Sequence, residues 1–272
     1  MPAIQSDLCF LTPKPIQPDL PLFVFLPGMD GTGKLLYTQA HSLEKCFDIR
    51  CLAIGRKNLS DWNALAERVL ELIKAELEKK SQRFVYLCGE SFGGCLAIEI
   101  ARRSPQIFNR IILINPASCF KQQPLLGWGE HLVSWMPDSL YQGVTLGLLP
   151  FIAALERLKK SEQRALLEAM KSIPSQTASW RLSLLADFIL EERLLNALKL
   201  PVLILASARD GILPSVREAK RLVNILPQGQ MVVLPSSGHT CLLERDISLY
   251  KIIKAKNFLE IDPYQKSYFA LA

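Results

Sequence analysis

Short runs of apolar residues recur along this chain, and the longer stretches between them repeat an apolar residue every three to four positions. The short runs predict buried strands, and the longer stretches predict amphipathic helices. Strands that alternate with helices are typical of a mainly parallel sheet with right-handed crossovers. The pattern therefore predicts an α/β fold, with strands at residues 8–11, 22–26, 48–54, 84–88, 110–114, 201–206 and 231–234.

The stretches that follow the strands predict helices. Asp61 is a suitable N-cap for a long amphipathic helix, because its carboxylate can accept a hydrogen bond from a free N–H of the first turn. Further helices are predicted at about residues 34–46, 91–103, 215–224 and 241–259.

Residues 117–196 interrupt this alternation, because they hold helical pattern and little strand pattern. Prolines divide the segment at 124, 137, 150 and 174. We predict a helical cap inserted into a single domain that covers residues 1–272. Within the cap, residues 139–155 carry no charge, but two glycines, a glutamine and a proline make a membrane span the weaker interpretation. A cap helix packed over the sheet is expected instead.

The strand predicted at 84–88 runs into Gly-Glu-Ser-Phe-Gly, and a helical pattern follows at once. A G-x-S-x-G motif between a strand and a helix is typical of a nucleophile elbow, in which Ser91 occupies a strained turn. Gly89 and Gly93 would let the strand and helix approach without a Cβ clash. The alternative is a glycine-rich turn without chemistry, and partners for the serine decide between the two.

A serine nucleophile needs a general base, and the chain has three histidines. His239 directly follows the strand predicted at 231–234, and ligands and catalysts gather at the carboxyl ends of parallel strands. His41 lies in a predicted helix and His131 in the cap, where surface or packing roles are expected. His239 is therefore the candidate base, against the alternative of a loop histidine without a role.

The base needs an acid that fixes its tautomer and stabilises the imidazolium. Asp210 directly follows the strand predicted at 201–206 and lies between Ser91 and His239 in the sequence, which is the order expected for this kind of elbow. Asp210-Gly is also a common turn without chemistry, but its place after the right strand favours a catalytic role.

The oxyanion of the reaction needs two N–H donors. One is predicted to be the N–H of Phe92, directly after the nucleophile. The other is predicted to be Met29, because Gly28-Met29 follows the strand at 22–26 and glycine lets the backbone turn its N–H toward the substrate.

Residues 28–34 also allow a second interpretation, since they satisfy G-x-x-x-x-G-K of a phosphate-binding loop. Position 35 is Leu, so the hydroxyl that binds Mg²⁺ in such loops is missing. No predicted strand ends in a clear metal-binding aspartate. A nucleotide-binding site is therefore the weaker alternative.

The composition of the chain limits the classes of binding partner that can be expected. The chain is 49% hydrophobic and has a net charge of +6, from 32 basic and 26 acidic residues mixed along its length. The absence of a basic block argues against nucleic acid, whereas attraction to an anionic membrane surface stays open. Seven cysteines without a C-x-x-C pair indicate reduced thiols of a cytoplasmic protein and neither disulfides nor a metal site. No secretory signal is seen at the N-terminus.

Five segments resemble the hydrolase half of the plant phytyl ester synthases, which belong to the esterase/lipase/thioesterase group and have cyanobacterial relatives. They are Leu-Pro-Gly-Met-Asp-Gly-Thr-Gly at 26–33, Cys-Gly-Glu-Ser-Phe-Gly-Gly-Cys-Leu-Ala at 88–97, Asn-Pro-Ala-Ser at 115–118, residues 203–215, and Gly-His-Thr-Cys-Leu-Leu-Glu at 238–244. The Asp-Gly-Thr-Gly loop is the most specific, because ordinary α/β hydrolases lack it. The resemblance covers about residues 20–258 and implies an α/β-hydrolase fold and ester chemistry on long-chain lipids, with the roles given above to Ser91, Asp210 and His239.

The chain departs from that family in one respect. The plant proteins continue into an acyltransferase-like domain with an H-x-x-x-x-D signature, and this sequence ends at Ala272 without one. Hydrolysis is therefore the simpler expectation, and acyl transfer to a long-chain alcohol is the alternative. A third alternative, from another functional class, is a catalytically inactive hydrolase scaffold that binds ligands.

These observations predict a serine esterase or lipase that acts on a lipid-like ester without metal or cofactor, with peripheral membrane contact left open. The cap is rich in large apolar side chains, and some of them are expected to line a substrate pocket or to face a membrane surface. The predicted pocket residues are Trp128, Leu132, Trp135, Met136, Leu148 and Phe151.

Overall fold

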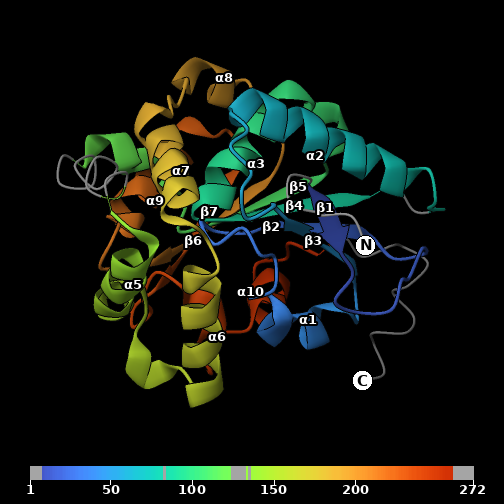
Figure 1. Ribbon diagram of the computed structural model, residues 1–272. Helices are drawn as coiled ribbons and strands as arrows, with labels where there is room; N and C mark the ends of the chain where they lie inside the picture. Colours follow the sequence, from blue (N-terminus) through green and yellow to red (C-terminus); the bar gives the residue numbers. More distant parts are fainter. Residues whose placement is uncertain (1–7, 82–83, 124–132, 134–135, 260–272) are drawn as a thin grey trace.

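The computed structural model describes residues 8–81, 84–123, 133 and 136–259 of the chain. Within these residues a seven-stranded sheet has the order β1-β3-β2-β4-β5-β6-β7 (Figure 1). The β1 strand pairs antiparallel with β3, and all other neighbours are parallel. The strands are β1 (Cys9–Leu11), β2 (Leu22–Leu26), β3 (Asp48–Ala53), β4 (Val85–Glu90), β5 (Arg110–Ile114), β6 (Val202–Ser207) and β7 (Gly229–Leu234). The predicted mainly parallel sheet is confirmed.

Every residue of β2, β4 and β6 is buried. Strands covered on both faces need apolar residues at successive positions, so they appear in the sequence as continuous apolar runs. This is why the predicted strand boundaries agree with the structure within two residues at either end.

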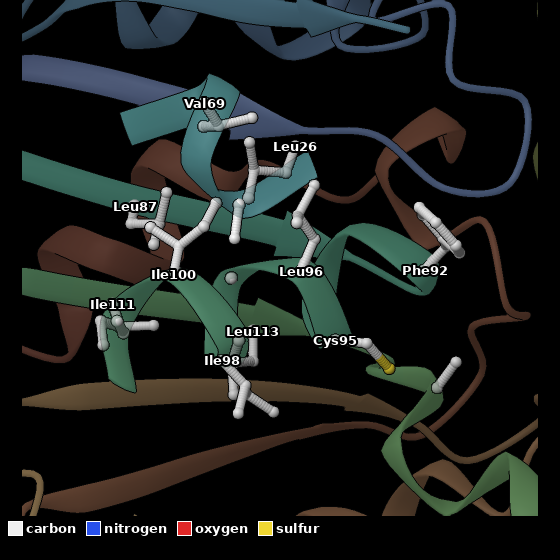
Figure 2. Close-up of a cluster of buried hydrophobic side chains, with 14 of the residues drawn as sticks. Leu26, Val69, Leu87, Phe92, Cys95, Leu96, Ile98, Ile100, Ile111 and Leu113 are labelled. Carbon is white, nitrogen blue, oxygen red and sulfur yellow. The ribbon is translucent and has the colours of Figure 1, made fainter. Parts of the chain in front are cut away.

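Helices cover both faces of the sheet. On one face, α2 (Trp62–Leu77), α3 (Phe92–Arg103) and α9 (Ser215–Ile225) contribute to the larger core. Figure 2 shows part of this core, where Leu96 and Ile100 of α3 lie among Leu26, Leu87 and Val69. On the other face, α1 (Tyr37–Leu43) and α10 (Leu249–Ala255) pack over a second core.

The helix ends show where sequence reasoning was right and where it failed. The carboxylate of Asp61 caps α2 by accepting a hydrogen bond from the N–H of Ala64 at 2.8 Å, as predicted. The helix predicted at 241–259 is wrong, because a short 3₁₀ turn, η4 (Cys241–Leu243), is followed by the separate helix α10. The chain is interrupted there because Glu244 turns its side chain back to the loop before η4, and Ser248 starts a new helix as its N-cap.

The described residues of the cap region 117–196 form helices and no strand. The cap elements are η2 (Ala117–Gln122), α5 (Asp138–Ile152), η3 (Leu155–Arg157), α6 (Lys160–Lys171), α7 (Ser175–Asp187) and α8 (Glu192–Asn196). Pro137 and Pro174 directly precede α5 and α7, as the predicted breaks require, whereas Pro150 lies inside α5. Among the described residues, no helix has the length and apolar character needed to cross a bilayer.

Candidate active site

Ser91 lies in the turn between β4 and α3 with φ 53° and ψ −113°, a backbone conformation that residues other than glycine rarely adopt. The neighbouring glycines make the turn sterically feasible. A Cβ on Gly89 would collide with the backbone of Gly93, and a Cβ on Gly93 would collide with the carbonyl of Leu26. The strand and helix therefore approach as closely as an elbow needs, and Ser91 is raised above the carboxyl end of β4.

The three predicted triad residues lie in one chain of hydrogen bonds. The Oγ of Ser91 is 2.9 Å from Nε2 of His239, and Nδ1 of His239 is 2.7 Å from Oδ2 of Asp210. The side chains of His239 and Asp210 are both buried. Residues 148 and 29 positions apart in sequence thus meet where β4, β6 and β7 end.

The carboxylate of Asp210 is held by three further donors. The N–H groups of Ile212 and Leu213 donate to Oδ1 at 2.9 and 3.0 Å, and Oγ of Ser215 donates to Oδ2 at 2.5 Å. Burial alone would raise the pKa of Asp210, but the His239 charge and these hydrogen bonds outweigh it and lower the pKa. Sequence reasoning missed Ser215, whose place at the first turn of α9 is visible only once the fold is known.

The same charge pair acts on His239. Burial lowers the pKa of the imidazole, but the Asp210 carboxylate outweighs burial, so the pKa of His239 lies above its ordinary value. An aspartate that stabilises the imidazolium in this way makes the histidine a stronger base toward the Ser91 hydroxyl.

Two buried polar residues fix the loop that carries His239. Asn115, at the end of β5 with φ 43°, donates from Nδ2 to the His239 carbonyl at 2.7 Å and to Oγ of Ser207 at 2.9 Å. Glu244 accepts hydrogen bonds from the N–H of Gly238 at 2.8 Å and from Oγ of Ser237 at 2.9 Å. Asn115 and Glu244 lie in two of the segments that resemble the plant phytyl ester synthases, but no local sequence pattern predicts these contacts.

The predicted oxyanion donors lie next to the nucleophile. A Cβ built on Gly28 would be 3.7 Å from Cβ of Ser91, so the Gly28-Met29 loop adjoins the elbow. Among the described residues, neither the N–H of Met29 nor that of Phe92 donates a hydrogen bond. An oxyanion hole requires two N–H groups without another acceptor, and Met29 and Phe92 stay the predicted donors.

The cap contributes an arginine to this loop that sequence reasoning missed. Arg181 of α7 is buried and donates from Nη1 to the carbonyl of Met29 at 2.6 Å and from Nη2 to the carbonyl of Gly55 at 3.4 Å. Gly31 has φ 65°, and a Cβ there would lie 2.5 Å from Nη1 of Arg181. The Asp-Gly-Thr-Gly loop therefore needs glycine at position 31 both for its backbone conformation and for the guanidinium.

Two further carboxyl groups face the site. Burial raises the pKa of Glu90 to about 7, although the His239 charge opposes this shift. Burial also raises the pKa of Asp30, whose Oδ2 accepts hydrogen bonds from the N–H and Oγ1 of Thr32. Glu90 interacts electrostatically with His239 and with Asp30, and Asp30 interacts with Arg181.

The cap residues predicted to line a substrate pocket have mixed outcomes. Trp128, Leu132 and Trp135 lie outside the described residues, and Met136 is partly buried. Leu148 and Phe151 are exposed, and their place in a substrate pocket stays a prediction. Helical phase accounts for the exposure of Phe151, because the buried Tyr141 and Thr145 form another face of α5. Leu148 follows Tyr141 by seven residues and so shares that face, yet its side chain is 40% exposed.

Within the described part of the chain, no group of three His, Cys, Asp or Glu side chains could hold a metal ion. All seven cysteines are free thiols. Burial raises the pKa values of the Cys51 and Cys119 thiols to about 12, so they are un-ionised at neutral pH.

The sequence profile of a family described as serine aminopeptidase, S33, matches residues 54–246. This range contains Ser91, Asp210 and His239. The chain belongs to this hydrolase family. It is also 33% identical over 267 residues to phytyl ester synthase 1, chloroplastic, of Arabidopsis thaliana, an alignment that covers 89% of this chain and 37% of that protein. The chain therefore spans little more than a third of the length of that relative.

Two further proteins are similar to this chain, one in sequence and one in fold. The chain is 26% identical over 175 residues to the pimeloyl-[acyl-carrier protein] methyl ester esterase of Aromatoleum aromaticum, with 58% of this chain and 67% of that protein covered. An alpha/beta hydrolase from a Medee basin deep-sea metagenome library has the same fold, with a TM-score of 0.74, 18% identity and coverage of 97% and 99% of the two chains. The chain is thus an α/β-hydrolase enzyme with esterase-type relatives.

Proposed function

We propose that this hydrolase cleaves a hydrophobic long-chain ester through a covalent acyl-enzyme. The single observation that carries the proposal is the continuous set of hydrogen bonds from Ser91 through His239 to Asp210, at 2.9 and 2.7 Å. A serine hydroxyl becomes an effective nucleophile when a positioned base takes its proton. The similarity to phytyl ester synthase 1 supports an ester of long-chain lipids as the substrate class.

In the first half-reaction, Oγ of Ser91 attacks the ester carbonyl while Nε2 of His239 takes the hydroxyl proton. The N–H groups of Met29 and Phe92 stabilise the oxyanion that forms. The tetrahedral intermediate then collapses, the carbon–oxygen bond to the alcohol breaks, and His239 gives its proton to the leaving alcohol oxygen. The acyl group remains on Ser91 as an ester.

In the second half-reaction, His239 takes a proton from water as the water attacks the acyl-enzyme carbonyl. Collapse of this second intermediate releases the carboxylic acid and returns the proton to Oγ of Ser91. Asp210 holds His239 in the required tautomer throughout, and its ionised state follows from its lowered pKa.

Acyl transfer to a long-chain alcohol is the second candidate, and the 33% identity to phytyl ester synthase 1 favours it. It shares every step except the last, in which an alcohol takes the place of water. An inactive binding scaffold is the third candidate, and the intact hydrogen-bond chain argues against it, since a binding protein has no need of a paired serine and histidine.

A fluorophosphonate probe followed by a series of p-nitrophenyl esters tests the proposal. We expect labelling of the wild type and of Ser236→Ala, an exposed serine of the His239 loop used as control, and none of Ser91→Ala. Labelling that persists in Ser91→Ala would identify another nucleophile. Product analysis with added phytol then separates the candidates, because a phytyl ester indicates transfer, free acid alone indicates hydrolysis, and no turnover with unlabelled Ser91 indicates a binding scaffold.

A further inference from the structure

The outward side of α5 is apolar and exposed to solvent. Five large apolar side chains of this helix are between 38% and 58% exposed, namely Leu140, Val144, Leu146, Leu148 and Phe151. Leu140, Val144 and Phe151 are spaced by four and seven residues and share one face of the helix. Gly143 and Gly147 lie between them with open space where a Cβ would be. We call the face that carries Leu140, Val144 and Phe151 the outer face of α5.

A helix that is apolar all round is normally buried in a protein core or in a membrane. The inward face of α5 is buried through Tyr141 and Thr145, but no described residue covers the outer face. With 15 residues, α5 is about 22 Å long, too short to span a bilayer core of about 30 Å. A helix of this kind can instead lie in the interfacial plane of a membrane, with its apolar side chains among the acyl chains.

The chain that follows α5 is basic. Lys159, Lys160 and Arg164 are exposed at the start of α6, which packs against α5 and lies on the same side of the molecule (Figure 1). Basic groups next to an apolar helix are attracted to anionic lipid headgroups and add to the affinity of the apolar contact. This charge pattern distinguishes a lipid surface from a neutral apolar partner.

The end of α5 also contacts both loops that carry the triad. A Cβ on Gly211, next to Asp210, would lie 2.7 Å from the carbonyl oxygen of Phe151, and a Cβ on Gly238, next to His239, would lie 2.6 Å from the N–H nitrogen of Ala154. The N–H of Thr240 donates to the carbonyl of Ile152 at 3.0 Å. The outer face therefore belongs to a helix that is fixed directly to the catalytic loops.

We propose that the outer face of α5 docks on an anionic lipid surface and holds the triad at the interface where its substrate is dissolved. Insertion of Leu140, Val144 and Phe151 among acyl chains removes exposed apolar surface from water. Lys159 and Lys160 bind headgroups at the end of the helix. The contact needs no turnover, so it can be tested separately from the proposed ester hydrolysis.

Co-flotation with vesicles tests the proposal, using full-length Ser91→Ala so that no lipid is consumed. We expect it to float with phosphatidylcholine vesicles that contain phosphatidylglycerol, and less with phosphatidylcholine alone. In that background Leu140→Glu with Val144→Glu should weaken binding at least about tenfold, because both side chains would lose their apolar contact. Lys159→Glu with Lys160→Glu should weaken binding to the anionic vesicles about tenfold.

Matched variants guard against general effects of added charge. Ile189→Glu changes an exposed apolar residue at the end of α7, and Lys254→Glu with Lys256→Glu changes two exposed lysines of the α10 end, so both should float as the parent does. In the active enzyme, Leu140→Glu with Val144→Glu should keep the hydrolysis of soluble p-nitrophenyl acetate unchanged. Undiminished flotation of Leu140→Glu with Val144→Glu overturns the proposal. A second result would also overturn it: the parent does not float and is a dimer, and Leu140→Glu with Val144→Glu dissociates that dimer. A second copy of the chain would then cover the outer face.

Discussion

At the scale of single residues, Asp210 is a heavily bonded side chain of the site. It receives hydrogen bonds from His239, Ser215 and two backbone N–H groups. Asp210→Asn would keep the shape of the side chain but place an NH₂ donor opposite a ring nitrogen that must donate. His239 would then adopt the wrong tautomer, and kcat should fall by about 10⁴-fold.

The measurement is kcat for a short soluble ester, with thermal unfolding as a check on folding. Asp187→Asn, an exposed aspartate at the end of α7, serves as the control and should be unchanged. Near-wild-type turnover of Asp210→Asn would mean that the acid lies elsewhere.

Glu90 gives a second prediction, about pH dependence. An ionised Glu90 raises the pKa of His239, and His239 must be neutral to act as a base. Glu90→Gln removes the negative charge, so the pKa of His239 should fall and the acidic limb of the kcat/KM profile should move to lower pH. The profile should be recorded beside that of Glu168→Gln, an exposed residue of α6. An acidic limb that stays in place or moves to higher pH contradicts the prediction.

The residues of the hydrogen-bond chain could be named from sequence because each directly follows a predicted strand. Ser91, Asp210 and His239 sit at strand ends, and the fold gathers strand ends at one edge of the sheet. Asn115 also follows a strand, but its residue type has no place in a catalytic triad, and Arg181 and Ser215 follow no strand. Their contacts join loops or helices whose relative placement is set by tertiary packing, and no spacing in the sequence encodes that placement.

At the scale of elements, Arg181 of α7 contacts the loop that carries Met29, a predicted oxyanion donor. Its guanidinium holds the carbonyl of Met29 at 2.6 Å, and burial lowers the pKa of Arg181 to about 10, so it remains charged at neutral pH. A lysine at this position could not keep both carbonyl contacts in one plane. Arg181→Lys should therefore displace the Met29 N–H and reduce kcat about tenfold, with KM little changed, since one fully lost donor costs about 10²–10³.

The split between kcat and KM distinguishes this positioning role from a structural one. Arg193→Lys, at an exposed arginine of α8, is the matched control. The rate of fluorophosphonate labelling should fall with kcat, because the probe also needs the oxyanion hole. If Arg181→Lys lowers the melting temperature but leaves kcat and the labelling rate unchanged, Arg181 has only a structural role.

The elements themselves were predictable to different degrees. The central strands β2, β4 and β6 were, because burial on both faces leaves a continuous apolar run in the sequence. The helix predicted at 241–259 was not, because an apolar pattern that suits a helix also suits a 3₁₀ turn followed by a new helix. The break depends on Glu244, whose carboxylate bonds to the N–H of Gly238 six residues earlier. Such a side-chain contact with a loop overrides local propensity.

At the scale of the whole molecule, the cap contacts loops at the carboxyl edge of the sheet in two places. Through α7 it holds the loop of Met29, and through the end of α5 it adjoins the loops of Asp210 and His239. Two faces of α5 thus have different surroundings. The outer face is exposed, whereas Tyr141 and Thr145 of the inward face are buried.

This arrangement predicts how activity depends on acyl length. Apolar groups of the cap, including Leu149 and Ile152 of α5, pack with Leu35 and Leu243 of the sheet domain in a small cluster. An acyl chain that runs from Ser91 toward these apolar groups would be buried against them. Each buried CH₂ contributes at most about 0.8 kcal/mol, or about fourfold in kcat/KM. We therefore expect kcat/KM for p-nitrophenyl esters to rise from acetate through octanoate, for as long as each added CH₂ finds apolar contact. The Leu140→Glu, Val144→Glu variant should give the same rise with these soluble esters, because its changes lie on the outer face. A maximum at acetate followed by a steady fall would mean a short polar cleft, and the lipid-like substrate would have to be abandoned even if Ser91, His239 and Asp210 catalyse the hydrolysis.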